Sequence, residues 1–425
     1  MLGRTGRGRS GAALLLVAAP ARADEEVTAR ADDAAPAVSA DAGFGAGVVG
    51  GSPLTAVDAG AGLAWDTGAL DVGARLRVVG DRFVTADWDE VGDWLALIRR
   101  FAWHGVETRL DGAEGWRGEL AVGPLGDARV GTGTLVDGYG GGVLADRRAS
   151  GAHGRLARGA TSVEALTGDL GRATLFAGGG AAAVGPLIVG GTVAIDPAAP
   201  RHADAMAAAP DASAPLAAVS ASATWGAATP RTRGTISLDA GWEPGLGVGA
   251  ALVGHGTARL SPRVTGRLRV EVGAGTAAWI PAPFGPLYLR EREVAGAADA
   301  MGVAPTLVDR ARAGELAGVG GAAAVALDVD DLGTGAVAVR VRPGLGPMLS
   351  ARLQLPAFAN AQGAVTTAWA PAERAFVLGA EARADLAHDL WTALEAARQY
   401  QGDDTPGLYA QRAVWQVTAW FGVAR

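Results

Sequence analysis

The fold of this 425-residue chain is decided by the stretch Ala413-Val414-Trp415-Gln416-Val417-Thr418-Ala419-Trp420-Phe421-Gly422-Val423. Successive side chains of a β-strand point to opposite faces, so the odd positions from Trp415 to Val423 share one face, which is wholly apolar. The even positions carry Gln416, Thr418, Trp420 and Gly422. About ten residues with one apolar face is the length that a tilted strand needs to cross a bilayer. We therefore predict a strand whose odd face meets lipid, with Trp420 on the opposite face.

The same two-residue period recurs upstream, with apolar residues on one face and charged or small residues on the other. It covers the segments 70–78, 116–122, 235–242, 267–272, 337–342, 349–355 and 376–386. Turn residues such as Thr67-Gly68, Asp330 to Gly333 and Pro343-Gly344 separate neighbouring segments. Strands joined by short turns predict an antiparallel meander. About 22 residues for each strand with its connection, over the roughly 365 residues after the leader, predicts about 16 strands.

The N-terminal residues have the three parts of a signal peptide. A basic start with three arginines is followed by the apolar run from Gly11 to Ala19 and by Ala21-Arg22-Ala23. This order predicts a signal peptide over residues 1–23, because the apolar run is about half the length that a membrane anchor needs. Residues 24–60 are acidic and rich in small residues, so we expect a flexible periplasmic leader there, with the barrel occupying 61–425.

Composition excludes several classes of protein. Ala203 to Ala228 is rich in alanine, but Pro210 and Pro215 interrupt it, and proline breaks a helix interior. Backbone groups in hydrocarbon must all be paired, so a chain without a spanning helix crosses a bilayer only as a closed barrel. The chain has no cysteine, hence no disulfide and no thiolate site. Its formal net charge of -7 argues against a nucleic-acid partner.

With a signal peptide, a succession of two-residue-period strands and a terminal strand rich in Trp and Phe, the chain resembles the bacterial outer-membrane β-barrel proteins, the porin-like group in particular. The resemblance covers most of the chain and is one of pattern. It implies an all-β fold, a transmembrane antiparallel up-and-down β-barrel in the bacterial outer membrane, with outer-membrane lipid and small polar solutes as partners. Such proteins commonly end on an aromatic residue, whereas this chain ends Phe421-Gly422-Val423-Ala424-Arg425.

Alternation alone does not say whether an apolar face meets lipid or a protein core. A secreted soluble β-protein would bury the same faces between two sheets. The barrel is favoured by strands of about ten residues, where soluble ones average five or six. Aromatic residues near strand ends predict interfacial girdles. They are Trp65, Trp103, Trp242, Trp279, Tyr288, Trp369, Tyr400 and Tyr409.

The polar faces of the predicted strands supply the candidate pore-lining residues. They are Arg75, Arg77, Arg117, Glu119, Arg267, Arg269, Glu271, Arg340, Arg342, Arg352, Glu381, Arg383 and Asp385. Charged rings set the ion preference of pores, so the excess of arginine in this set predicts a weak preference for anions. We expect a passive diffusion porin. The alternatives are a closed or plugged structural or binding barrel of the envelope and a secreted soluble β-protein.

No motif in the sequence indicates catalysis, so we expect neither an enzyme nor a cofactor. The five histidines are scattered, without metal-ligand spacing, and no Gly-x-Ser-x-Gly elbow occurs. The acidic cluster at 87–93 lacks the spacing of a calcium loop, and the glycine runs at 131–134 and 138–142 are interpreted as turns because no lysine follows them. Arg99, Arg100 and residues 290–293 either line a constriction or form ordinary salt bridges. The solute and the oligomeric state stay open.

Overall fold

The computed structural model describes residues 36–84, 88, 91–105, 115–125, 128–140, 149–172, 174–202, 211–276, 279–280, 283–292, 305–358, 361–371, 375–387, 389–402 and 411–424. The predicted signal peptide lies outside these residues. In the described part of the chain, no helix is long and apolar enough to span a membrane.

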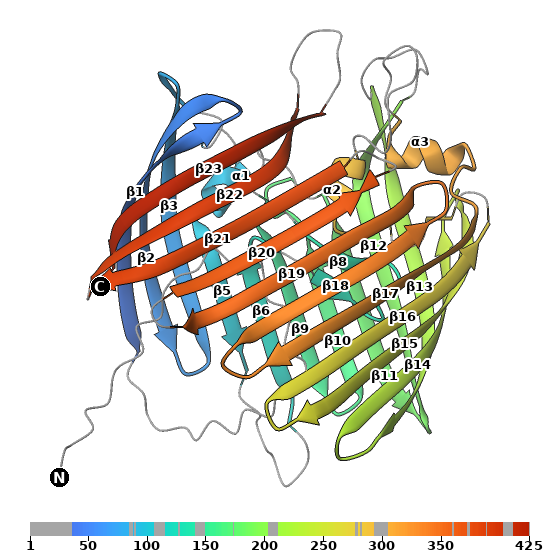
Figure 1. Ribbon diagram of the computed structural model, residues 1–425. Coiled ribbons are helices and arrows are strands. Elements are labelled where there is room, and N and C mark those ends of the chain that lie inside the picture. The colour runs from blue at the N-terminus through green and yellow to red at the C-terminus, as the bar shows by residue number, and fades with distance from the viewer. Residues whose placement is uncertain are drawn as a thin grey trace, which may run out of the picture.

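The chain folds into a ring of antiparallel strands (Figure 1). The first half comprises β1 (Ala37–Val49), β2 (Ser52–Trp65), β3 (Gly68–Val79), β5 (Ile98–His104), β6 (Arg117–Gly123), β9 (Gly151–Arg158), β10 (Thr161–Thr167), β11 (Phe176–Val184), β12 (Leu187–Arg201) and β13 (Ala212–Ala228). The second half comprises β14 (Thr232–Glu243), β15 (Gly247–Ser261), β16 (Val264–Gly275), β17 (Gly318–Val329), β18 (Gly333–Arg342), β19 (Gly346–Phe358), β20 (Ala361–Ala370), β21 (Ala375–Ala387), β22 (Leu390–Gly402) and β23 (Gln411–Ala424).

The ring is closed by its first and last strands. β1 pairs with β23 from Asp41↔Ala424 to Val49↔Gln416, and the blue and red strands lie side by side in Figure 1. Closure leaves no edge strand with unpaired backbone groups. The barrel architecture that the sequence resemblance implied is therefore confirmed.

Alternation along the strands sets an apolar outside against a polar inside. On β23, Phe421 is 62% exposed on the outer face and Trp420 is 2% exposed on the inner one, as the sequence predicted. On β16, Leu268 and Val270 face outward while Arg269 is buried inside. Large apolar side chains that are exposed in this way occur on nearly every strand of the ring. An apolar surface of this extent marks contact with lipid or with another apolar phase.

The two rims of the barrel differ in the length of their connections. At the rim that holds the chain termini, adjacent strands are joined by short turns such as 66–67, 185–186, 262–263 and 330–332. The other rim carries the long connections 80–97, 124–150, 202–211, 276–317 and 403–410. Two of these contain further elements, β7 (Ala128–Val130) with β8 (Val136–Tyr139), and α2 (Tyr288–Glu291) with α3 (Leu307–Arg312). A third contains α1 (Val91–Leu95) and the short β4 (Arg82–Phe83).

The structure corrects the predicted number of strands. The main sheet has 21 described strands, of which β4 pairs with β3 alone, so the described ring has 20 strands and not about 16. The estimate assumed about 22 residues for each strand and connection, but most turns at the terminal rim take only two or three residues.

The expected extent of the leader is also corrected. β1 begins at Ala37 and β2 at Ser52, so the barrel starts well before residue 61. These strands are rich in alanine and glycine, as in Ala40-Asp41-Ala42-Gly43, and lack the large apolar residues that make alternation visible.

The aromatic residues near strand ends take two different positions. Trp103, Trp242 and Trp369 are exposed on the outer face, as a girdle requires. Trp279 and Tyr288, which were expected in the same girdle, are buried inside the barrel at 4% and 1% exposure. Tyr409 and the side chain of Tyr400 lie outside the described residues.

Candidate functional site

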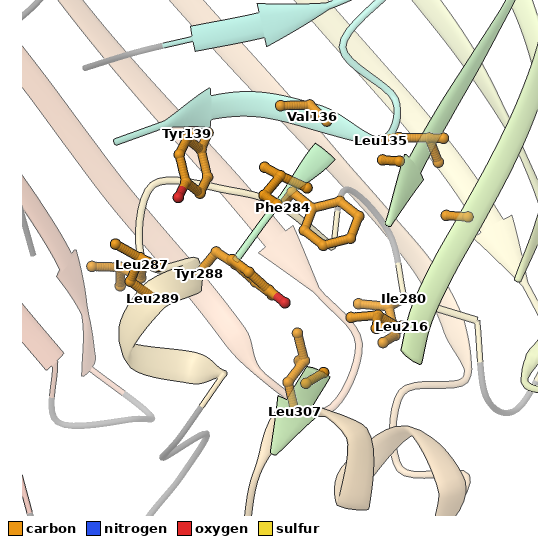
Figure 2. Packing of buried hydrophobic residues seen from close by; sticks show 14 of the residues in the cluster. Leu135, Val136, Tyr139, Leu216, Ile280, Phe284, Leu287, Tyr288, Leu289 and Leu307 are labelled. Atoms are coloured by element: carbon orange, nitrogen blue, oxygen red, sulfur yellow. The ribbon is translucent and has the colours of Figure 1, made fainter. Parts of the chain in front are cut away.

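Two segments from the long-loop rim fold into the barrel. We call residues 128–140, which form the β7–β8 pair, the inner hairpin, and residues 279–292, which end in α2, the inner arm. A parallel bridge joins Val136 to Phe284, and the Phe284 amide donates to the Leu135 carbonyl at 3.2 Å. Phe284 and Tyr288 pack edge to face with ring centroids 4.8 Å apart, and Tyr139 lies beside them (Figure 2). The two segments thus form one packed unit.

This unit reaches across the lumen. Its apolar cluster includes Leu166 on β10, Leu216 on β13, Met348 on β19 and Ala370 on β20. β10 to β13 and β19 to β21 lie on nearly opposite sides of the ring of 20 strands. The lumen at this level is therefore narrowed by a packed apolar core that bridges its walls.

Trp279 anchors the inner arm on a patch of glycine. Gly241, Gly249 and Gly275 pair in register across β14, β15 and β16 and face inward. A Cβ atom added to any of the three would collide with the indole ring of Trp279. Glycine at these positions lets the ring lie directly on the backbone of the wall.

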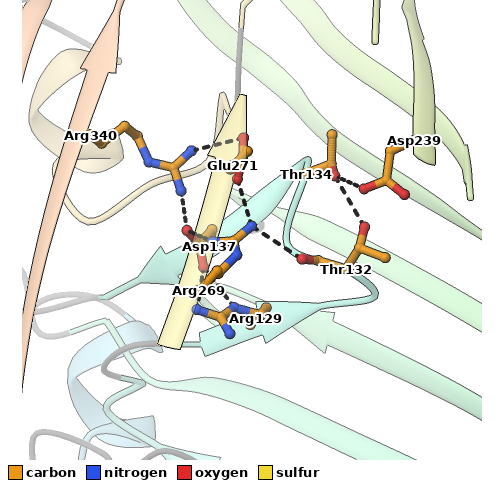
Figure 3. A network of polar contacts seen from close by, with 8 residues as sticks. All are labelled: Arg129, Thr132, Thr134, Asp137, Asp239, Arg269, Glu271 and Arg340. Carbon is orange, nitrogen blue, oxygen red and sulfur yellow. Dashed lines mark hydrogen bonds and ion pairs between the residues drawn. The ribbon is translucent and has the colours of Figure 1, made fainter. Parts of the chain in front are cut away.

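A charged network holds the inner hairpin to the wall (Figure 3). Asp137 of β8 accepts hydrogen bonds from Arg129, Arg269 and Arg340. Glu271 accepts from Arg269 at 2.7 Å. Burial would raise the pKa of the Asp137 carboxyl, but the three guanidinium groups outweigh burial and hold its pKa well below the ordinary value.

Ion pairs also hold the inner arm and the helix that follows it. Glu291 of α2 pairs with Arg342 on β18, and both side chains are buried. Tyr288 and Arg292 both donate to Asp196 on β12 at 2.5 Å. Burial raises the pKa of Tyr288 well above its ordinary value, so this hydroxyl keeps its proton and acts as a donor.

α3 is tied to β12 by a histidine. Asp309 accepts from Nδ1 of His202 at 2.7 Å and caps its own helix through Thr306. Burial would raise the pKa of Asp309, but hydrogen bonds from His202 and Thr306 lower it below its ordinary value. The long-loop rim is thus fastened to the wall at several separate points.

A second cluster lines the wall on either side of the closing seam. We call it the acidic pocket, and its lining residues are Asp41, Asp58, Asp71, Arg75, Arg99, Glu381, Arg383, Trp391, Ala393, Glu395 and Trp420. Arg75 on β3 donates to both oxygens of Glu395 at 3.1 Å, although β23, β1 and β2 lie between β3 and β22 in the ring. The guanidinium of Arg75 stacks 4.4 Å from the ring centroid of Trp420.

A shift in strand pairing aims Arg99 into this pocket. β3 and β5 lose register by one residue between Asp71↔Arg100 and Val72↔Ile98, which leaves Arg99 outside the ladder. Such an irregularity re-aims a side chain. Arg99 thereby reaches Asp58, and its Nη1 lies 3.7 Å from Asp41.

The predicted pore-lining residues divide between these two clusters and the remaining wall. Arg75, Glu381 and Arg383 line the acidic pocket. Arg269, Glu271, Arg340 and Arg342 are buried against the inner hairpin and the inner arm. Elsewhere on the inner faces of their strands lie Arg77, Arg117, Glu119, Arg267, Arg352 and Asp385, all at least partly exposed.

Sequence reasoning missed Asp41, Asp58, Asp71, Asp137 and Glu395. Asp41 and Asp58 fall in the segment that was expected to be a leader, and Asp137 falls in a segment without strand period. Asp71 was visible, because it shares the inner face of β3 with Arg75.

Several other expectations can be placed. The glycine run at 131–134 is the turn between β7 and β8, with positive φ at Gly131 and Gly133, as predicted. Arg99, Glu291 and Arg292 form ion pairs on the inner side of the barrel. Asp87, Asp89 and Glu90 lie outside the described residues, within which no group of three or more acidic or histidine side chains could hold a metal ion.

Comparison with solved structures finds porins. The chain is similar to OccAB3 of Acinetobacter baumannii, with 8% identity, 92% of this chain and 99% of that chain covered, and a TM-score of 0.36. It is similar to the outer-membrane protein OpdK of Pseudomonas aeruginosa, with 10% identity, 92% and 98% covered, and a TM-score of 0.34. A Rhodopseudomonas blastica porin matches with 9% identity, 91% and 100% covered, and a TM-score of 0.30.

No protein-family model matches the chain, and no curated protein matches it. At the identities and TM-scores of the solved porins, no property of theirs carries over to this chain. The closed ring, its apolar outer face and its charged inner face stand on the structure of the chain itself.

Proposed function

We propose that the chain is an outer-membrane β-barrel that acts as a passive diffusion pore for small polar solutes. The observation that carries this proposal is the division of faces in a closed ring: exposed apolar side chains outside, and arginine and carboxylate side chains inside. Rings of 16 to 18 strands leave an aqueous channel in known barrels, and a described ring of 20 strands is wider. The mechanism is sieving by the narrowed lumen together with the field of its charges, without chemistry and without a cofactor.

Conductance in a planar bilayer tests the proposal. Purified protein is added to a membrane bathed in potassium chloride, and stepwise current increases are the expected result. Heat-modifiable gel mobility of the same preparation shows that the barrel is folded. A folded, inserted barrel that passes no current refutes the pore function.

A plugged barrel that serves as a structural or binding protein is the second candidate. The observation that favours it is the apolar cluster bridging β10–β13 to β19–β21 through the inner hairpin and inner arm. Trp279→Ala separates the two candidates, because loosening the inner arm creates current in a plugged barrel and only increases it in a pore. The lipid-facing Trp225→Ala, whose side chain is 52% exposed, is the matched control.

A further inference from the structure

The acidic pocket carries more negative than positive charge. Its lining has the carboxylates of Asp41, Asp58, Asp71, Glu381 and Glu395 against the guanidinium groups of Arg75, Arg99 and Arg383. Arg75 is bound by Asp58 and Glu395, and Arg99 by Asp58 and Asp41. Asp71 and Glu381 form no ion pair within the described residues, so the pocket retains negative charge.

Polar atoms in this pocket are buried without partners. Oδ1 of Asp71, which is 9% exposed, has no hydrogen bond, and neither has the indole Nε1 of Trp391 or Trp420, which are 7% and 2% exposed. A buried polar atom without a partner costs about 1–3 kcal/mol, so a group that hydrogen-bonds to it there is favoured. The pocket therefore offers unused acceptors and donors at one place in the lumen.

The arginines of the pocket show how it holds a cation. The guanidinium of Arg75 lies between carboxylates and the face of Trp420, and that of Arg383 lies 4.5 Å from the ring centroid of Trp391. Carboxylates and indole faces both attract guanidinium and ammonium groups. Asp41, Arg75, Arg99 and Glu395 keep 14% to 19% of their side chains exposed, so the pocket is open to the lumen.

We propose that the acidic pocket is a binding site for a small organic cation, a solute carrying a guanidinium or primary ammonium group, with Asp71 and Glu381 as its carboxylate partners. The proposal rests on the pore function above, since such a solute reaches the pocket through the lumen. It also predicts a local field opposite to the weak anion preference expected from the sequence. That expectation omitted Asp41, Asp58, Asp71 and Glu395.

Block of the potassium chloride current by ethylguanidinium tests the site. We expect ethylguanidinium to reduce the current of the unaltered protein, and Asp71→Asn with Glu381→Gln to raise the half-blocking concentration about tenfold, the loss of one charge-assisted contact. Asp330→Asn with Asp331→Asn is the charge-matched control, because both residues are exposed in the turn between β17 and β18. The φ of 67° at Asp331 is one that asparagine tolerates. Its half-blocking concentration should stay unchanged.

Calorimetric titration of the detergent-purified barrel with ethylguanidinium separates this inference from the pore function. Binding without any current would refute the pore and leave the site standing. Current without block or binding would refute the site and leave the pore standing, and so would equal block of the unaltered and doubly substituted proteins. Glu381→Gln alone serves if the double variant lacks heat-modifiable mobility, with a smaller increase expected.

Discussion

At the scale of single residues, glycine on the inner face makes room for charge. Gly73 faces the lumen from β3, and a Cβ atom added to it would overlap the guanidinium of Arg99. The same arginine occupies the space beside Gly60 on β2. Absent side chains here do not widen an open channel, because another residue fills each gap.

Gly73→Ala is therefore expected to expel Arg99 from its place between Asp41 and Asp58. Leaving these carboxylates without their cation lowers the free energy of unfolding by about 1–3 kcal/mol. The midpoint of urea unfolding, followed by heat-modifiable mobility, measures the loss. Gly256→Ala is the control, because its added methyl group meets no atom within 4 Å. Equal midpoints for the two variants would contradict this account of Gly73.

The residues of each strand face could be predicted, but their partners could not. Alternation places Arg75 opposite Leu76, and the structure agrees. It does not indicate that Arg75 meets Glu395 on β22, because that contact depends on the closure and curvature of the whole ring. The bulge that aims Arg99 inward is likewise a product of pairing between β3 and β5.

At the scale of elements, the inner hairpin and inner arm decide how much of the lumen is open. Their sequences have no strand or helix period over a useful length, so the sequence indicated only a long connection from Pro281 to Gly314 and turns at 131–142. The fold of such a segment is set by the wall it packs on. Trp279 lies on three glycines from three strands, which no local pattern reveals.

Acid is expected to release the inner hairpin. The pKa of Asp137 is held below its ordinary value, so its ion pairs stabilise the hairpin fully above about pH 4 and are lost as the pH falls through the lowered pKa. Hydrogen exchange of amides 130–139, corrected for intrinsic rates, should therefore accelerate in strong acid. Asp137→Asn should show fast exchange already at pH 7, without a further acid response. Slow exchange in that variant at pH 7 would show that the apolar contacts alone hold the hairpin.

Trp279→Ala is expected to free the inner arm. Truncation of a buried tryptophan costs about 3–5 kcal/mol, and here that loss falls on a segment that the wall strands do not need for their own pairing. We expect higher single-channel conductance with an unchanged unfolding midpoint of the ring. Trp225→Ala, on the lipid-facing side, should leave the conductance unchanged. A conductance equal in both variants would mean that the inner arm does not restrict the lumen.

At the scale of the whole molecule, the closed ring follows from the sequence while its size does not. Closure follows from apolar faces on many strands without a spanning helix. The number of strands depends on turn lengths and on strands such as β1 and β11, whose alanines and glycines conceal their alternation. The weakly amphipathic strands therefore account for the difference between about 16 and 20.

The outer face provides the last prediction, because lipid and water respond differently to a charge placed there. Leu268 lies near the middle of β16 and is 50% exposed outward. In a bilayer, Leu268→Arg should cost about 2–4 kcal/mol of stability, whereas Ser350→Arg, on the inner face of β19, should cost much less. Urea titration of the barrel folded into lipid vesicles measures both. If the barrel works in water instead, an arginine at Leu268 would be solvated and nearly neutral. Equal stability of the two variants would then refute the membrane location.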